Sequence, residues 1–170
     1  LSNFNLLYTN TQLENLIFKS IIDENTISDD ASSTLSSIRR NKKRLEQDIK
    51  DKLNSMLHSS SYSKYIMEPI VTIRNDRYVI PVKIEYKDNI KGFIHDISSS
   101  GSTVFIEPIT VFELNTKISN LKIEENIEIE KILKNISESI LPICENLKED
   151  TFLIGRLDFI FAKAAYADRK

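Results

Sequence analysis

One apolar seam with nearly heptad spacing constrains the fold of this chain more than any other feature. Its members follow one another at steps of four, three, seven, four, four and three residues: Ala31, Leu35, Ile38, Leu45, Ile49, Leu53 and Met56. This spacing is typical of a long helix that packs against a second helix. Ser28 is a good N-cap, and Asp29 and Asp30 follow in the first turn, where the helix dipole favours acid. We therefore predict a helix over residues 29–57, about 40 Å long at 1.5 Å per residue.

A second long seam follows Pro108. It comprises Leu114, Ile118, Leu121, Ile129, Ile132, Ile136, Ile140 and Ile143. Neither seam can be buried by its own helix, so we predict that the two long helices pack against each other. Pro142 is expected to kink or break the second helix. Shorter helices are predicted at residues 11–22 and 151–168.

Between the two seams the pattern changes to short runs rich in β-branched residues. The predicted strands are Ile70–Arg74, Arg77–Tyr86, Phe93–Ile97 and Thr103–Ile106. Asn75 and Asp76 mark a turn, and the Ser/Gly-rich residues 98–102 join the last two strands. Pro81 has no N–H to donate, which predicts that its strand lies at an edge or carries a bulge there.

These elements predict an α+β fold that is mainly α. Long antiparallel helices form an arm, and a small, mostly antiparallel sheet sits at its tip. The expected divisions are residues 1–66 (N-terminal helices), 67–108 (β subdomain) and 109–170 (returning helices). The 170 residues begin with Leu1 and end in a helical pattern, so we expect a segment of a longer protein.

Composition narrows the function classes. The net charge of -2 gives no global attraction to nucleic acid or to an anionic membrane, so any such binding must use local patches. Cys144 is the single cysteine, which excludes a disulfide framework and fits a reducing compartment. The sequence shows no run of eighteen apolar residues and no signal peptide. We therefore expect a cytoplasmic protein with no membrane partner.

The block from His95 to Pro108 holds the residue types of several kinds of site. A phosphate cradle around Gly101 is disfavoured, because an apolar strand rather than a Lys and a helix follows it. A hydrolytic triad of His95, Asp96 and Ser98 is disfavoured, because neighbouring residues of a strand point to opposite faces. Only one other His exists, which argues against a metal site. We predict no catalytic residue, no metal and no cofactor in this segment.

Basic residues form the candidate nucleic-acid contacts, in two groups. One group, Arg39, Arg40 and Lys43, belongs to the basic run at residues 39–44; the other lies on or beside the predicted sheet and comprises Arg74, Arg77, Lys83, Lys87 and Lys91. Contacts of this kind would go to phosphates and would be independent of sequence. The alternative is a solvated helix surface for the first group and ordinary surface charge for the second.

Several motifs together carry a family resemblance. In chain order they are Ile27-Ser28-Asp29-Asp30-Ala31-Ser32 with Leu35 and Ile38-Arg39, the run Arg74-Asn75-Asp76-Arg77-Tyr78-Val79-Ile80-Pro81-Val82-Lys83, the run Gly92-Phe93-Ile94-His95-Asp96, the run from Ser98 through Gly101 and Thr103 to Phe105-Ile106-Glu107-Pro108, and Leu157-Asp158 with Ala162-Lys163-Ala164. Over residues 27–170 the chain thus resembles the second bacterial family of MutS-like proteins, the Smr-carrying paralogues of mismatch-repair MutS.

The resemblance implies that this is the core/lever and clamp segment of a larger protein. The parent would be an ATPase that binds ATP and Mg²⁺ in a separate domain, and an endonuclease through its Smr domain. The family's phosphate loop, G-x-x-x-x-G-K-[ST], is absent from these residues. The implied partners are a second copy, as a homodimer, and branched or duplex DNA in suppression of recombination, or the rRNA of stalled ribosomes. The rival hypothesis is a helical-hairpin module that binds proteins and has no nucleic-acid role.

Overall fold

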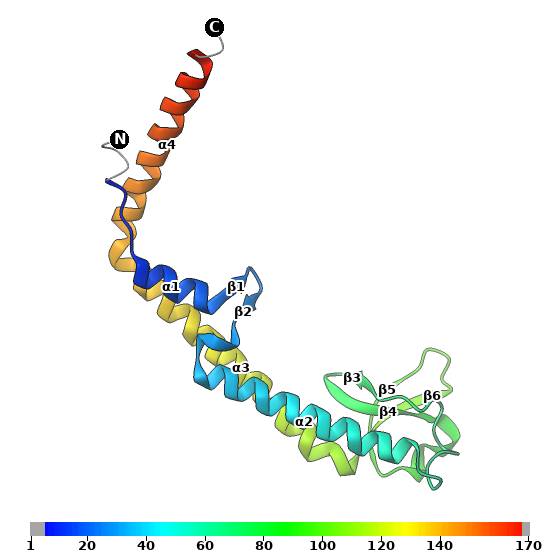
Figure 1. Ribbon diagram of the computed structural model, residues 1–170. Coiled ribbons are helices and arrows are strands. Elements are labelled where there is room, and N and C mark those ends of the chain that lie inside the picture. The colour runs from blue at the N-terminus through cyan, green and yellow to red at the C-terminus, as the bar shows by residue number, and fades with distance from the viewer. Residues whose placement is uncertain (1–5, 168–170) are drawn as a thin grey trace. The chain divides into compact units, whose positions relative to one another are not determined.

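Helices make up most of the chain in the computed structural model, which describes residues 6–167 (Figure 1). The mainly helical α+β class predicted from the sequence is confirmed. The elements in chain order are α1 (Thr11–Ser20), β1 (Ile21–Asp23), β2 (Thr26–Ile27), the 3-10 turn η2 (Asp29–Ala31), α2 (Ser33–Leu57), β3 (Thr72–Arg74), β4 (Arg77–Lys83), the 3-10 segment η3 (Ile84–Asn89), β5 (Gly92–Ile97), β6 (Thr103–Pro108), α3 (Ile109–Ile140), the 3-10 turn η4 (Leu141–Ile143) and α4 (Cys144–Ala167).

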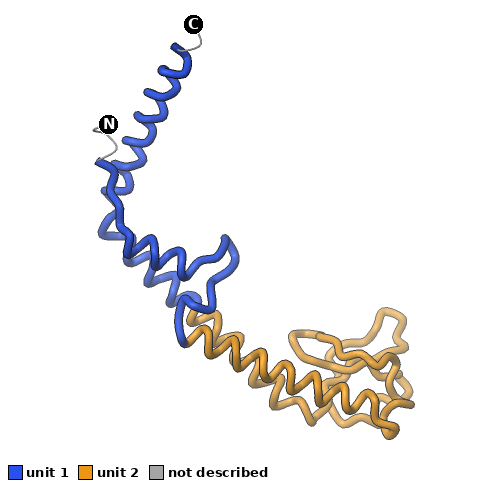
Figure 2. The backbone as a smooth tube through the Cα atoms, viewed as in Figure 1, with its two compact units in different colours: residues 1–33, 129–170 blue, residues 34–128 orange. Residues whose placement is uncertain are grey.

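The chain divides into two compact units (Figure 2). Residues 34–128 form one unit, which contains nearly all of α2, the larger sheet and the first part of α3. Residues 1–33 and 129–170 form the other unit, which contains α1, the small β1–β2 hairpin, the rest of α3, and α4. The candidate functional residues lie in the unit 34–128.

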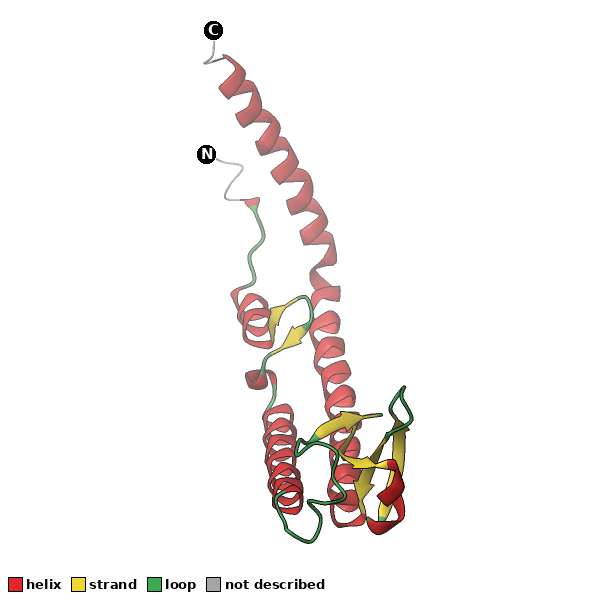
Figure 3. Cartoon of the chain, turned by 90° about the vertical axis from the view of Figure 1, so that its right-hand side faces the viewer, coloured by secondary structure: helices red, strands yellow, loops and turns green. Residues whose placement is uncertain are grey.

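In the unit 34–128, α2 and the first part of α3 run antiparallel and share one core with the sheet (Figures 1 and 3). Ile49 and Leu53 of α2 and Ile118 of α3 are buried in this core. The strands contribute Tyr78, Ile80, Val82, Val104 and Ile106. Within the unit 34–128 the predicted pairing of the two long helices is therefore confirmed, and the sheet covers the paired helices where α2 ends and α3 begins.

The start of the first long helix differs from the prediction. Ser28 accepts a hydrogen bond from the Asp30 N–H at 3.1 Å, as an N-cap does, but the turn it caps is the separate η2. Ser32 is extended, with φ -150° and ψ 150°, so η2 and α2 are not continuous. The helix predicted from residue 29 therefore begins at Ser33.

The larger sheet has the order β3-β4-β6-β5, and all of its pairs are antiparallel. The β3–β4 turn consists of Asn75 and Asp76, whose φ values of 50° and 61° give the left-handed backbone that tight hairpins require. The strand predicted to reach Tyr86 ends at Lys83, because residues 84–89 wind into η3.

The prediction that the strand lies at an edge or carries a bulge at Pro81 is wrong, because β4 lies inside the sheet and pairs with β6 in unbroken register there. β3 pairs only with residues 77–79, so it has ended before Pro81. Beyond that point the Met67 N–H donates to the Pro81 carbonyl at 3.0 Å. The neighbouring segment thus bonds to the carbonyl oxygen of Pro81 and needs no N–H from it. For this reason a proline can occupy an inner strand here.

Pro142 breaks the second long helix, as predicted. α3 ends at Ile140, Pro142 lies within η4, and α4 begins at Cys144. The last helix was predicted only from residue 151, and its predicted end, Asp168, lies outside the described residues. α4 has no buried residue and exposes large apolar side chains such as Phe152, Phe159 and Phe161. Within residues 6–167, no helix has both the length and the apolar composition to cross a membrane.

Candidate nucleic-acid interface

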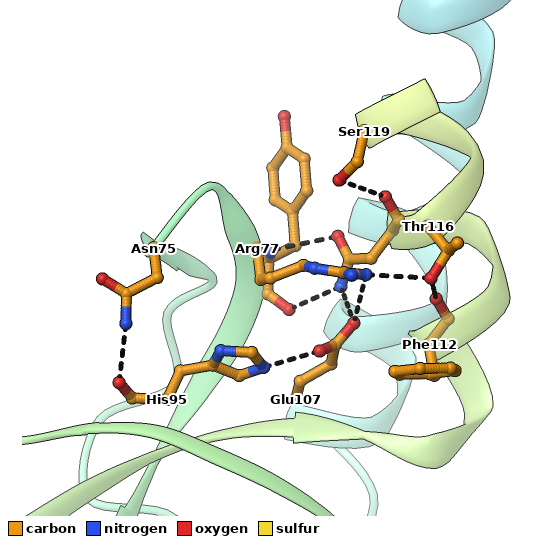
Figure 4. Close-up of polar contacts among 9 residues, drawn as sticks. Asn75, Arg77, His95, Glu107, Phe112, Thr116 and Ser119 are labelled. Carbon is orange, nitrogen blue, oxygen red and sulfur yellow. Dashed lines mark hydrogen bonds and ion pairs between the residues drawn. The ribbon is translucent and has the colours of Figure 1, made fainter. Parts of the chain in front are cut away.

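The four-stranded sheet is curled so strongly that its two edge strands touch. Neighbouring strands lie about 4.8 Å apart, so in a flat sheet the outer strands would be about 14 Å apart. Instead, the Arg74 guanidinium of β3 pairs with Asp96 of β5 at 3.2 Å. The amide of Asn75, in the β3–β4 turn, donates to the His95 carbonyl of β5 at 2.8 Å (Figure 4). The outer face of the sheet therefore becomes an interior.

Glu107 of β6 lies in this interior with no exposed surface. His95 Nε2 is 2.6 Å from its Oε2. Arg77 Nη1 at 3.3 Å and Asn115 Nδ2 at 2.7 Å both donate to its Oε1 (Figure 4). A buried carboxylate is costly unless it is paired and hydrogen-bonded, and here both oxygens have partners.

Asn115 of α3 extends this Glu107 cluster to β4. Its Oδ1 accepts from the Tyr78 N–H at 3.0 Å, and its Nδ2 donates to the Tyr78 carbonyl at 3.1 Å. The side-chain amide thus bonds to both the N–H and the carbonyl of one strand residue, as the backbone of an adjacent strand would. Arg77 also donates to Thr116 Oγ1 at 3.1 Å. The cluster consequently joins β4, β5, β6 and α3.

Two local features of β5 bring His95 to Glu107. Gly92 begins the strand opposite Pro108, and a Cβ at Gly92 would lie 2.2 Å from the Glu107 carbonyl oxygen. Only glycine permits this approach of the two strands. The register then shifts at His95, which is an extra residue between Ile94 and Asp96. A shift of this kind re-aims a side chain, here the imidazole toward the buried carboxylate.

Sequence reasoning did not find this cluster. Arg77, His95 and Glu107 were each part of a motif, but nothing in their spacing showed that they meet. Asn115 and Thr116 were missed altogether. The signals were present: Glu107 interrupts an apolar strand, and Asn115 lies four residues after Val111 and three before Ile118, on the buried side of α3.

Four of the eight predicted contact residues are already engaged within the chain. Arg77 belongs to the Glu107 cluster, and Arg74 pairs with Asp96 and stacks 4.1 Å from the centre of the Phe105 ring. Lys83 donates to the Lys64 carbonyl at 3.3 Å. Arg39 donates to Glu125 at 2.7 Å, and Lys42 pairs with the same carboxylate. Burial acts to raise the pKa of Glu125, but the hydrogen bonds from Lys42 and Arg39 outweigh it and hold the pKa below its ordinary value.

The other four predicted contact residues are exposed: Arg40, Lys43, Lys87 and Lys91. Within residues 6–167, none of these four side chains is in an ion pair. Two of these residues, Arg40 and Lys43, lie on α2, and the other two lie beside the sheet. Lys43 is fourteen residues before the end of α2, which is roughly 21 Å of helix. Lys87 and Lys91 flank the end of η3, next to the sheet. The structure therefore does not bring the two groups into one patch.

A groove of about 1060 Å³ lies beside Lys91 in the unit 34–128. It runs between the last part of α2, the start of α3 and the segment that joins η3 to β5. Apolar side chains, including Met56, Tyr62 and Ile109, line it together with Lys52 and Lys91. Sequence reasoning identified Lys91 but missed Lys52 and Tyr62. No group of three His, Cys, Asp or Glu side chains in the described part of the chain is arranged to hold a metal ion.

The chain was compared with family models and with known proteins. No family model matches the chain. Proteins named Endonuclease MutS2 match it from Acetivibrio thermocellus, with 54% identity over 93% of the chain, and from Clostridioides difficile, with 45% identity over 94% of it. A Bacillus subtilis protein named putative endonuclease MutS2 is 47% identical over 95% of the chain. The chain spans about one fifth of the length of these relatives.

Proposed function

We propose that this chain, which is 45–54% identical to part of proteins named endonuclease MutS2, is a non-catalytic lever and clamp segment of a MutS2-family ATPase and endonuclease. In this role the helices act as the lever, and the curled sheet between α2 and α3 acts as the clamp that contacts nucleic acid. The relatives' name, endonuclease, supports a parent protein that acts on nucleic acid.

The observation that carries the proposal is the division among the cations near the sheet. Arg74, Arg77 and Lys83 are engaged inside the unit, whereas Lys87 and Lys91 are exposed and pair with no acid of the described residues 6–167. A clamp needs internal bonds that make it rigid and free cations that can meet phosphates. The unit 34–128 has both, and its phosphate contacts would be independent of sequence.

The remaining parts of the proposal concern the full-length protein. Its substrates are branched or duplex DNA, in suppression of recombination, or the rRNA of stalled ribosomes. It acts in the cytoplasm as a homodimer. ATP and Mg²⁺ bind in a domain outside these residues, so that domain, rather than this segment, supplies the energy for clamp movement.

The test is the salt dependence with which the full-length protein binds a labelled four-way DNA junction. A clamp that contacts phosphates should lose about 10³- to 10⁵-fold in affinity between about 50 mM and 200 mM salt if it makes 6–10 contacts. Lys87→Gln and Lys43→Gln should each reduce the slope of log affinity against log salt by about 0.9. Lys134→Gln is the control, because Lys134 is already close to Glu138 at 3.9 Å on the exposed face of α3.

The rival hypothesis, a protein-binding helical hairpin with no nucleic-acid role, makes the opposite prediction. The full-length protein would then bind neither junction, duplex nor RNA at low salt. That result would overturn the proposed function. Binding with an unchanged slope in both variants would leave the family role in place but remove Lys43 and Lys87 from the interface.

A further inference from the structure

We propose that the groove between Lys52 and Lys91 binds an unpaired nucleic-acid strand, with a base against Tyr62 and the adjoining phosphates between the two lysines. The proposal rests on the proposed function, since it assumes that the protein binds nucleic acid. It goes further by assigning a groove that shares Lys91 with the proposed clamp contacts, and a different substrate form, a single strand rather than a duplex backbone.

The charges of the groove fit a phosphate chain. Lys52 projects from α2 and Lys91 from the segment before β5, so the two cations come from different walls. Both are exposed, and neither forms an ion pair within residues 6–167. The one acid of the lining is Asp51, whose Oδ1 already accepts from Gln47 at 2.8 Å. The lining therefore carries a net positive charge.

The helix ends beside the groove do not decide whether its electrostatic potential is positive or negative. The first turn of α3 contributes Ile109 and Thr110 to the lining, and the last turns of α2 contribute Ser55 and Met56. A helix N-terminus carries about +0.5 charge and a C-terminus about -0.5, so the two contributions largely cancel. The attraction for an anion consequently depends on Lys52 and Lys91.

The apolar lining indicates that the occupant has a flat, weakly polar face. Tyr62 is half-buried, with part of its side chain against the core and part lining the groove, and Met56 and Ile109 also line the groove. Bases stack on such aromatic surfaces in single-strand sites. In a duplex the base faces are already stacked on one another, so only an unpaired strand can use this lining.

The size of the groove is compatible with a strand. Sites for drug-sized ligands have volumes of about 300–1,000 Å³. The groove, at about 1060 Å³, lies at the upper end of this range and has room for more than one nucleotide.

The experiment compares a fluorescent oligo-thymidine strand with a blunt duplex of the same length, each bound by the full-length protein and followed by anisotropy. Lys52→Gln with Lys91→Gln should reduce the salt slope for the single strand by about 1.4, because each phosphate contact contributes about 0.7. Tyr62→Leu should weaken single-strand binding about 5- to 150-fold, and Tyr62→Phe should restore it. Lys117→Gln is the matched control, an exposed lysine of α3 outside the groove.

The outcomes separate this inference from the proposed function. Selective loss of single-strand binding in Tyr62→Leu, with duplex binding and the melting temperature unchanged, supports the groove. The lysine double variant is judged by its single-strand salt slope alone, because Lys91 also belongs to the proposed duplex contacts. Duplex binding by the wild type together with unaltered single-strand binding by the groove variants overturns the groove and leaves the proposed function standing. Loss of dimerisation with unaltered single-strand binding also overturns it, in favour of a second copy as occupant. Absence of all nucleic-acid binding by the wild type overturns both proposals.

Discussion

The carboxylate of Glu107 is fully buried, and side chains from three elements lie within hydrogen-bond distance of its two oxygens. His95 comes from β5, Arg77 from β4 and Asn115 from α3. Removing one charged partner from such a group costs more than an ordinary surface change, because the remaining charge stays buried. At the residue scale, the Glu107 cluster is therefore the point where the curled sheet is most sensitive to substitution.

Arg77→Ala should destabilise the protein by about 3 kcal/mol, the lower end of the range for breaking a buried ion pair. The lower end applies because the Arg77 side chain is 22% exposed while that of Glu107 is fully buried. Urea denaturation of the 170-residue chain measures this, with Lys87→Ala as the control because Lys87 is exposed and forms no ion pair in the described part of the chain. Equal stability of the two variants would contradict the role assigned to Arg77. The same geometry means that Arg77 is a poor choice for testing nucleic-acid binding.

The three glycines of the chain give a matched series. Gly92→Ala should cost about 1–3 kcal/mol, because the new methyl group would meet the rigid backbone of Glu107. Gly101→Ala should cost roughly 1 kcal/mol, because its φ of 71° is unfavourable for residues with a Cβ. Gly155→Ala lies in α4 with open space around it and should be neutral or stabilising by up to about 1 kcal/mol. A denaturation midpoint of Gly92→Ala that is not the lowest of the three would refute the packing assigned to Gly92.

At the scale of elements, Glu125 connects the two long helices, since it belongs to α3 and accepts from Arg39 of α2. Its pKa is lowered in the folded state, so it contributes stability above its ordinary pKa of 4.5, and this contribution disappears as the pH falls through the folded-state value. The stability difference between wild type and Glu125→Gln should therefore be constant near neutral pH and shrink on acidification below about pH 5.

The control for Glu125 is Glu138→Gln, because Glu138 forms only an exposed pair with Lys134. An exposed pair contributes about 0–1 kcal/mol, so this variant should stay close to wild type at every pH. Urea denaturation at a series of pH values measures both variants. A difference for Glu125→Gln that does not change with pH would show that its ion pairs with α2 do not stabilise the folded chain.

The elements also show what sequence patterns could and could not predict. Periodicity identified both long helices and four strands, because spacing decides which residues can share a face. It gave the wrong limits where a local conformation intervened, as at the extended Ser32 and at η3. The position of Pro81 in the sheet was predicted wrongly, because a residue without an N–H was assumed to need a free edge. In the structure the segment beside Pro81 donates the Met67 N–H to the Pro81 carbonyl, so no donor is required from Pro81.

The candidate site was predictable only in part. Exposed cations such as Lys87 and Lys91 could be found from the sequence, because charge and turn position suffice for that. The engagement of Arg77 by Glu107, and the placement of Lys52 and Lys91 in the lining of one groove, depend on segments that are distant in sequence and adjacent in the fold. Spacing along the chain carries no information about such approaches.

At the scale of the whole molecule, stability should be uneven. α2 buries Leu35, Ile49 and Leu53 completely, whereas α4 has no buried residue along its 24 residues. A helix without tertiary packing is only marginally stable in water. In hydrogen exchange of the 170-residue chain, we expect the amides of α4 to exchange much faster than those of α2. Protection of α4 equal to that of α2 would show that its apolar side chains are covered in solution, and dilution would then reveal whether a second copy covers them.

The contact between the outer strands has a consequence for how this protein behaves when copies are crowded together. An exposed sheet edge is a template on which another chain can add a strand, and such addition leads to aggregation. Here β3 is three residues long, β5 has an extra residue at His95, and Arg74 and Asp96 place charges at the two edges. These are the devices that protect natural sheet edges. Two such sheets could therefore be brought close together, as in a dimer, without joining into one continuous sheet.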